Sequence, residues 1–112
     1  ESFMANSEPI ERALVAAMAS SPAFGIRGEP FTLANIAAEM RRRHLSLKLP
    51  VLDGACRDLV NGGFLSPERD TYRFTIPVFA RLIRENYSVD AFLQDLRNEY
   101  THRPEPRRGR AA

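Results

Sequence analysis

This sequence has almost none of the residue types from which metal and cofactor sites are built. It contains one cysteine, Cys56, and two histidines, His44 and His102, and it lacks tryptophan. A single cysteine excludes an intrachain disulfide and a cysteine-rich zinc site. The two histidines have no partners at metal-ligand spacing. Neither a glycine-rich phosphate loop nor a dinucleotide fingerprint occurs. We therefore expect no metal, no cofactor and no catalytic residue, and a protein that is not an enzyme.

Long apolar runs are also missing. No stretch approaches the roughly 20 apolar residues that a membrane-spanning helix needs, and no secretory signal pattern opens the sequence. Cys56 lies at helical spacing from Leu52, Ala55 and Leu59, which is typical of a buried structural thiol in a reducing compartment. We expect a cytoplasmic protein without a membrane partner. Many Arg and Ala residues beside a single Lys favour a bacterial source.

The length and charge of the chain limit what it can be. With 112 residues it is expected to form one domain around one small core. The formal net charge is +2, and much of this excess lies between Arg103 and Arg110. Such a mild excess permits nucleic-acid binding without demanding it. We interpret residues 1–6 as a tag or linker, residues 7–102 as the domain and residues 103–112 as a basic disordered tail.

Apolar residues spaced three and four apart predict helices. The first helix follows Ser7 and has Leu14 and Met18 on its apolar face, and the second follows Thr32; both Ser7 and Thr32 are typical N-cap residues. The third has the clearest apolar face, made of Leu52, Ala55, Cys56, Leu59 and Val60. The triplet Asn61-Gly62-Gly63 is expected to end this helix, because glycine reaches the left-handed conformation without steric cost.

A β-hairpin is predicted directly after the third helix. Its first strand begins at Phe64, and residues 66–70 are rich in turn-forming side chains. Phe31 is expected to lie in a short extended segment that pairs with this hairpin. The return strand alternates apolar and polar residues, and its buried side should carry Tyr72, Phe74 and Ile76.

Two further helices follow the hairpin. The fourth begins at Pro77, which suits a first helical position; we expect Val78, Phe79, Leu82 and Ile83 to face inward and Arg81, Arg84 and Glu85 to face water. The fifth follows Ser88 and carries an apolar stripe of Val89, Phe92, Leu93, Leu96 and Tyr100. Left in water, that stripe would form a large apolar patch. It must therefore pack on the first helix or pair with a second copy, and we favour a homodimer.

This order of elements predicts a mostly α-helical fold with a small β-hairpin wing, a winged helix-turn-helix with an additional C-terminal helix. In such folds the third helix usually enters the DNA major groove and the wing touches the backbone or the minor groove. The candidate DNA-binding residues are Arg41, Arg42, Arg43, Lys48, Arg57, Asn61, Arg69 and Arg73. Two aspartates, Asp53 and Asp58, share the outward face of the third helix, which lowers affinity for phosphates. The arginines at 41–43 fit equally well as partners for the negative end of the second helix.

Residues 59–86 also carry a family pattern. Its elements are Gly63-Phe64-Leu65 leading into the wing, Tyr72-Arg73-Phe74 on the return strand, and Pro77-Val78 before a helix with Arg81, Leu82 and Ile83. This pattern resembles the C-terminal winged-helix domain that follows the nucleotide-binding core in bacterial and archaeal ATPases of the signal-transduction and origin-recognition kind. The ATPase core itself is absent, so no nucleotide site can be carried over.

Two functions follow from these observations. The first is binding of double-stranded DNA through the third helix and the wing, in transcription regulation. The second is a protein-interaction module that docks on an ATPase core in the same full-length protein, or on its own copy, without direct DNA readout.

Overall fold

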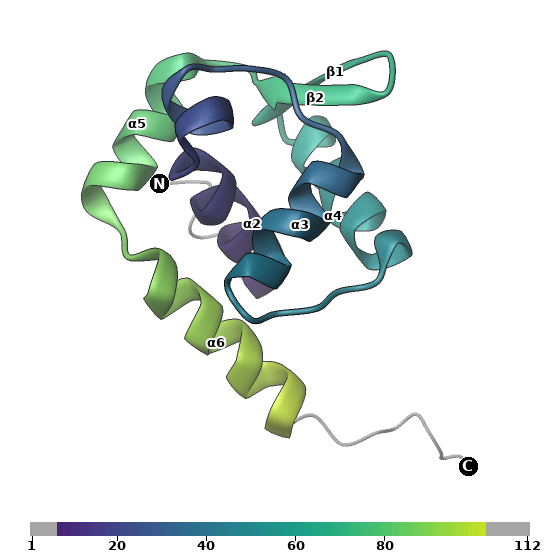
Figure 1. Ribbon diagram of the computed structural model, residues 1–112, viewed down its shortest axis with the longest axis vertical. Helices are drawn as coiled ribbons and strands as arrows, with labels where there is room; N and C mark the ends of the chain where they lie inside the picture. The colour runs from purple at the N-terminus through teal and green to yellow at the C-terminus, as the bar shows by residue number, and fades with distance from the viewer. Residues whose placement is uncertain (1–6, 103–112) are drawn as a thin grey trace.

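The computed structural model describes residues 7–102, and side chains up to residue 99. Its elements are helix α2 (Pro9–Ala19), a π-helical turn η1 (Pro22–Ile26), helices α3 (Leu33–Arg42) and α4 (Leu49–Asn61), strands β1 (Leu65–Glu68) and β2 (Thr71–Phe74), and helices α5 (Pro77–Asn86) and α6 (Val89–His102). The expected fold class is confirmed: the domain is mostly helical, with one antiparallel hairpin and an additional C-terminal helix (Figure 1). The predicted tag and tail lie outside the described residues.

Helix α2 lies at the centre of the domain, with α5 and α6 on one side and α3 and α4 on the other (Figure 1). Every residue from 13 to 19 is at most 1% exposed, so this part of the helix is buried on all sides. The apolar face predicted around Leu14 and Met18 was therefore too narrow. Alanine makes up the rest of this segment apart from Val15, and small side chains allow several helices to approach closely, as expected for a helix that is apolar all round.

The helix starts follow capping chemistry. The hydroxyl of Thr32 accepts a hydrogen bond from the Asn35 backbone N–H (3.1 Å), and the Asn35 side chain accepts one from the Thr32 N–H (2.8 Å), so the predicted Thr32 cap is confirmed. Ser7 is not the cap of the first helix. Glu8 takes that position, and the Glu11 carboxylate accepts from the Glu8 N–H at 3.2 Å.

Two helices end in a left-handed residue. Gly63, with φ of 85°, ends α4 as predicted: its N–H donates to Val60 and the next N–H donates to Leu59. Helix α3 ends the same way at His44, which has φ of 68°. The His44 N–H donates to the Arg41 carbonyl at 2.8 Å. These bonds satisfy carbonyl groups that a helix end leaves without partners. They assign a structural role to His44, since its backbone closes the helix.

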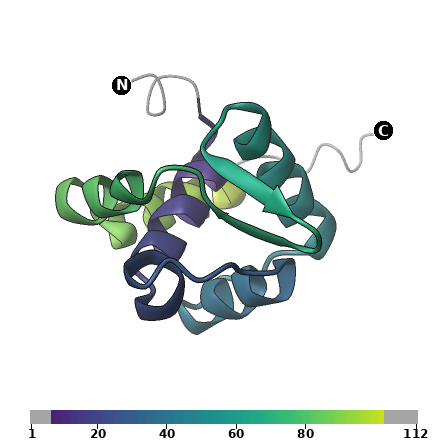
Figure 2. The ribbon, with the colours of Figure 1, turned by 90° about the horizontal axis from the view of Figure 1, so that it is seen from above.

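The hairpin has a shorter turn than the sequence indicates. Strand pairing runs from Leu65 opposite Phe74 to Glu68 opposite Thr71, so only residues 69 and 70 form the turn. Most of the turn-like segment thus belongs to β1. On the other side of β2, the backbones of Phe31 and Tyr72 exchange hydrogen bonds of 2.8 and 2.7 Å, which confirms the predicted extended segment. Seen from above, the hairpin runs between this segment and α4 (Figure 2).

The inward face of α5 differs from the prediction. Ala80 and Ile83 are the buried residues of this helix, whereas Val78 and Leu82 are each 50% exposed. The small Ala80 side chain lets α5 approach α2 closely, and this turns Val78 and Leu82 toward solvent. Ile76 is 57% exposed because β2 ends at Phe74 and the strand alternation ends with it.

Helix α6 packs against α2 within the same chain. Phe92, Leu93 and Leu96 are at most 8% exposed, and Val89 is partly buried against the same core. This is the first of the two arrangements expected for the stripe, and it leaves those side chains little surface for a second copy. The side chain of Tyr100 lies outside the described residues. Within residues 7–102, none of the helices is both long and apolar enough to cross a membrane.

The contact between η1 and α2 requires glycine at position 25. A Cβ atom added there would lie 1.9 Å from the Ala19 carbonyl oxygen, which is far inside van der Waals contact. Gly25→Ala should therefore lower the free energy of unfolding by roughly 1–3 kcal/mol, as overpacking does. Chemical denaturation measures this change.

Gly54→Ala is the matched control, because a Cβ there meets nothing within 4 Å and the residue lies inside α4. The free energy of unfolding of this variant should rise by about 0.5–1 kcal/mol, because alanine has a higher helix propensity than glycine. Equal stability of the Gly25 and Gly54 variants would contradict the close packing of η1 on α2.

Candidate binding surfaces

The residues predicted to bind DNA are spread over four regions. Arg41, Arg42 and Arg43 lie at the end of α3, where the Arg43 carbonyl oxygen accepts a hydrogen bond from Arg97 of α6 (2.7 Å). Arg57 and Asn61 belong to α4, Lys48 is the N-cap residue of that helix, and Arg69 lies in the wing turn beside the start of α3. Arg73, on β2, faces η1 and α5 instead. The structure therefore does not gather this set into one patch.

Four of these arginines form ion pairs. Arg57 pairs with Asp53 on the outward face of α4, and Arg42 and Arg43 share the nearly buried carboxylate of Glu39. Arg73 pairs with Glu68 across the hairpin, at 3.2 Å. In contrast, Arg41, Lys48 and Arg69 form no ion pair within the described part of the chain. A role in DNA binding remains a prediction for all eight residues.

The charge of the domain is balanced. Residues 7–102 contain twelve Lys or Arg and twelve Asp or Glu, so the formal charge of this range is zero. On α4, Asp53 and Asp58 flank the exposed Arg57. Asp53 also lines a shallow depression together with Arg69 and Asp70. The surface formed by α4 and the wing turn is therefore a mixture of both signs.

Cys56 is a buried thiol of the core, as predicted. Burial, with a smaller contribution from Asp53, raises its pKa to about 12. The thiol therefore stays protonated at neutral pH, and a protonated buried thiol is a poor nucleophile. Among the described residues, no three His, Cys, Asp or Glu side chains lie close enough together to hold a metal ion.

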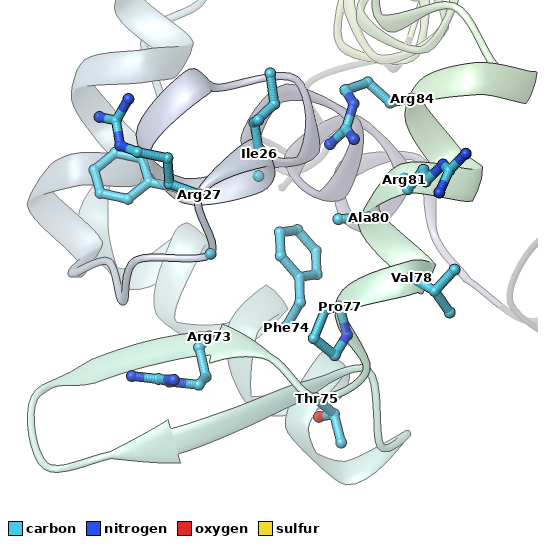
Figure 3. Close-up of a pocket in the computed structure, with 13 residues that line it drawn as sticks. Ile26, Arg27, Arg73, Phe74, Thr75, Pro77, Val78, Ala80, Arg81 and Arg84 are labelled. Atoms are coloured by element: carbon cyan, nitrogen blue, oxygen red, sulfur yellow. The ribbon is translucent and has the colours of Figure 1, made fainter.

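A cleft with a volume of about 590 Å³ lies between η1, β2 and α5 (Figure 3). The ring of Phe74 points into its centre, and Ile26 and Val78 flank it. No described carboxylate lines the cleft. Four arginines do: Arg27, Arg73, Arg81 and Arg84. This positively charged cleft with an apolar floor is the most distinctive surface of the domain.

One of the four arginines is structural. Arg84 donates to the carbonyl oxygen of Ala19 at the end of α2, at 2.9 Å, and is half-buried; the prediction that it faces water is wrong. The other three project into solvent, each beside one glutamate outside the cleft. The ion pairs are Arg27–Glu29 at 3.0 Å, Arg73–Glu68 at 3.2 Å and Arg81–Glu85 at 3.0 Å.

Sequence reasoning missed this cleft. It placed Val78 in the core and assigned no element to residues 22–26, so Arg27 had no assigned neighbours. The only signal in the sequence is the pair Arg81 and Arg84, three residues apart on α5, a spacing that brings side chains to the same side of a helix. Comparisons with family models, with curated proteins and with solved structures found no match. Functional inference therefore rests on the surfaces themselves.

A buried carboxylate on α2 makes stability depend on pH. Burial raises the pKa of Glu11, and the nearby Asp58 carboxylate adds to this, while the hydrogen bond from the Glu8 N–H partly opposes it. The folded state therefore binds a proton more readily than the unfolded chain. Between the unfolded pKa of 4.5 and the higher folded pKa, the free energy of unfolding falls as pH rises.

Glu11→Gln removes this titration and keeps an acceptor for the Glu8 N–H. We expect the variant to melt at a higher temperature than the wild type at pH 7, and this advantage to disappear below the ordinary carboxyl pKa. Asp95→Asn, at an exposed position on α6, is the control and should show a smaller change. A Glu11→Gln advantage that is the same at acid and neutral pH would contradict the raised pKa.

Proposed function

We propose that this chain is a winged-helix binding module, not an enzyme, that acts in the cytoplasm by docking on a protein partner. One observation carries the choice of a protein: α5 presents Val78 and Leu82, four residues apart and each half exposed, and Ile26 across the cleft is 61% exposed. Exposed apolar side chains that gather on one face are typical of interaction sites, whereas isolated ones are not.

The α4 face supports the same choice. To read a guanine, Arg57 would have to leave Asp53, and the duplex would bring phosphates toward Asp53 and Asp58. Each such approach opposes binding, because nonspecific DNA affinity comes from neutralising phosphates with Lys and Arg. The domain has zero formal charge over its described range, so it has no excess of positive charge to offset the repulsion between these aspartates and the phosphates.

DNA binding is the second candidate function. Arg41, Lys48 and Arg69, which form no ion pair in the described range, are free to contact phosphates. They belong to the end of α3, the start of α4 and the wing turn, the elements that contact the DNA backbone in other winged helices. This arrangement supports weak backbone binding without base readout.

Duplex titration by fluorescence anisotropy separates the two candidates. We expect salt-sensitive, sequence-independent binding with a Kd of roughly micromolar or weaker at physiological salt. The triple change Arg41→Ala, Lys48→Ala and Arg69→Ala should abolish it, whereas Arg57→Ala should leave the binding sequence-independent.

Selection from random duplexes is the sharper form of this test. A selected sequence that binds about 10³-fold tighter than random DNA, with the preference lost in Arg57→Ala, would overturn the protein-docking proposal and assign the domain to DNA recognition.

A further inference from the structure

The cleft between η1 and α5 has two chemical properties in one place. Its floor and flanks are apolar, with the ring of Phe74 between Ile26 and Val78, and its rim carries Arg27 and Arg73 on one side and Arg81 on the other (Figure 3). A ligand that fits both must combine apolar groups with negative charge.

We infer that this cleft binds an acidic amphipathic segment of a partner protein, an inference that rests on the proposed protein-docking function. Apolar side chains of the segment cover Ile26, Val78 and Leu82. Its carboxylates pair with the guanidinium groups of Arg27 and Arg81, which accept carboxylates in a bidentate geometry.

The existing ion pairs do not block such a ligand. The side chains of Arg27 and Arg81 are 60% and 65% exposed, and their partners Glu29 and Glu85 are more than half exposed. Exposed pairs of this kind contribute only about 0.2–1 kcal/mol, so a ligand carboxylate can replace or share each glutamate. Arg84 takes no part, because it is bound to the Ala19 carbonyl oxygen.

The extent of the apolar surface favours a polypeptide over a small anion. A volume of about 590 Å³ alone would suit a small molecule. However, Leu82 lies one helical turn beyond Val78, is 50% exposed and does not line the cleft, so the apolar stripe continues past it. A segment of chain lying along α5 covers this whole stripe.

The type of apolar residue disfavours nucleic acid. Proteins that bind single strands stack bases on aromatic side chains, but the two aromatic rings that line the cleft belong to the core: Phe74 is only 7% exposed, and Phe24 is partly buried against the same core. The exposed apolar groups at the cleft are Ile26 and Val78, whose branched aliphatic side chains offer no flat surface for a base. They match the leucine, isoleucine or phenylalanine side chains of a peptide.

The probe is a fluorescein-labelled synthetic peptide with Glu and Leu repeated along one helical face, titrated with the whole chain. We expect Arg81→Glu and Val78→Ser each to weaken binding about tenfold or more, a change of roughly 1.4 kcal/mol. Binding should also weaken as salt rises. Melting curves check that each variant remains folded.

Two matched controls lie on α4. Arg57, like Arg81, is exposed and pairs with a carboxylate four residues away, and Val51, like Val78, is an exposed valine near the start of a helix that has proline in its first turn. Arg57→Glu and Val51→Ser should leave the Kd within about twofold, less than 0.5 kcal/mol. The same peptide with Glu replaced by Gln should bind about tenfold more weakly, because its charge is gone.

Several results would overturn this inference. Equal binding of the Gln peptide would remove the role of charge, and a larger loss with Arg57→Glu than with Arg81→Glu would move the site to α4. Light scattering that shows a dimer, reduced to monomer by Val78→Ser, would assign the cleft to a second copy.

The inference and the proposed function fail in different ways. Sequence-selective DNA binding would overturn the proposed function, whether or not the peptide binds. Absence of peptide binding, together with nonselective DNA binding, overturns only the assignment of this cleft and leaves docking through another surface, such as Leu49 and Val51 at the start of α4.

Discussion

The carbonyl end of α2 is the constraint on which the rest of the structure depends. This helix is buried on all sides from residue 13 to residue 19, so its last carbonyl groups cannot all reach water, and a buried polar group without a partner is costly. The Ala19 carbonyl oxygen accepts a hydrogen bond from Arg84, which comes from α5, far along the chain. The backbone at Gly25 rests against the same carbonyl group. One peptide group thus joins three elements.

That junction also forms the cleft. Gly25 brings η1 onto the end of α2, and Arg84 draws α5 toward the same point. The cleft lies between η1 and α5, and Phe74 of β2 forms its floor. The cleft is therefore a consequence of how the domain buries its central helix, and its shape depends on two residues that take no part in binding a ligand. The exposed arginines at its rim do not hold elements together as Arg84 does, and we therefore connect them to function.

The fold was predictable where the signals are local. The apolar face of α4, the Thr32 cap and the left-handed Gly63 each depend on residues within a few positions of one another. The pairing of the segment at Phe31 with the hairpin was also predicted, although its partner residue, Tyr72, was not. The orientation of α5 was not, because it depends on Ala80 fitting against α2, a contact between distant segments that periodicity alone does not encode.

The binding surfaces were less predictable, for two physical reasons. The basic residues were predicted as DNA contacts or, for those at 41–43, as partners of a helix end. Their pairing with carboxylates was not predicted, yet Arg57 lies four residues from Asp53, and Arg42 and Arg43 lie three and four residues from Glu39. This spacing favours pairing on a helix and was visible in the sequence. The arginine cleft, in contrast, joins η1, β2 and α5, and no local pattern brings Arg27 to Arg81.

The central claim is that the domain binds a partner through the cleft between η1 and α5, and does not read DNA through α4. Backbone amide NMR shift mapping tests this most directly, with the acidic amphipathic peptide and duplex DNA added in separate titrations. The account predicts that the peptide shifts the amides of Ile26, Arg27, Val78 and Arg81 and leaves Arg57 and Asn61 unmoved. Peptide-induced shifts confined to α4, or DNA-induced shifts at Arg57 and Asn61 that depend on base sequence, would contradict it.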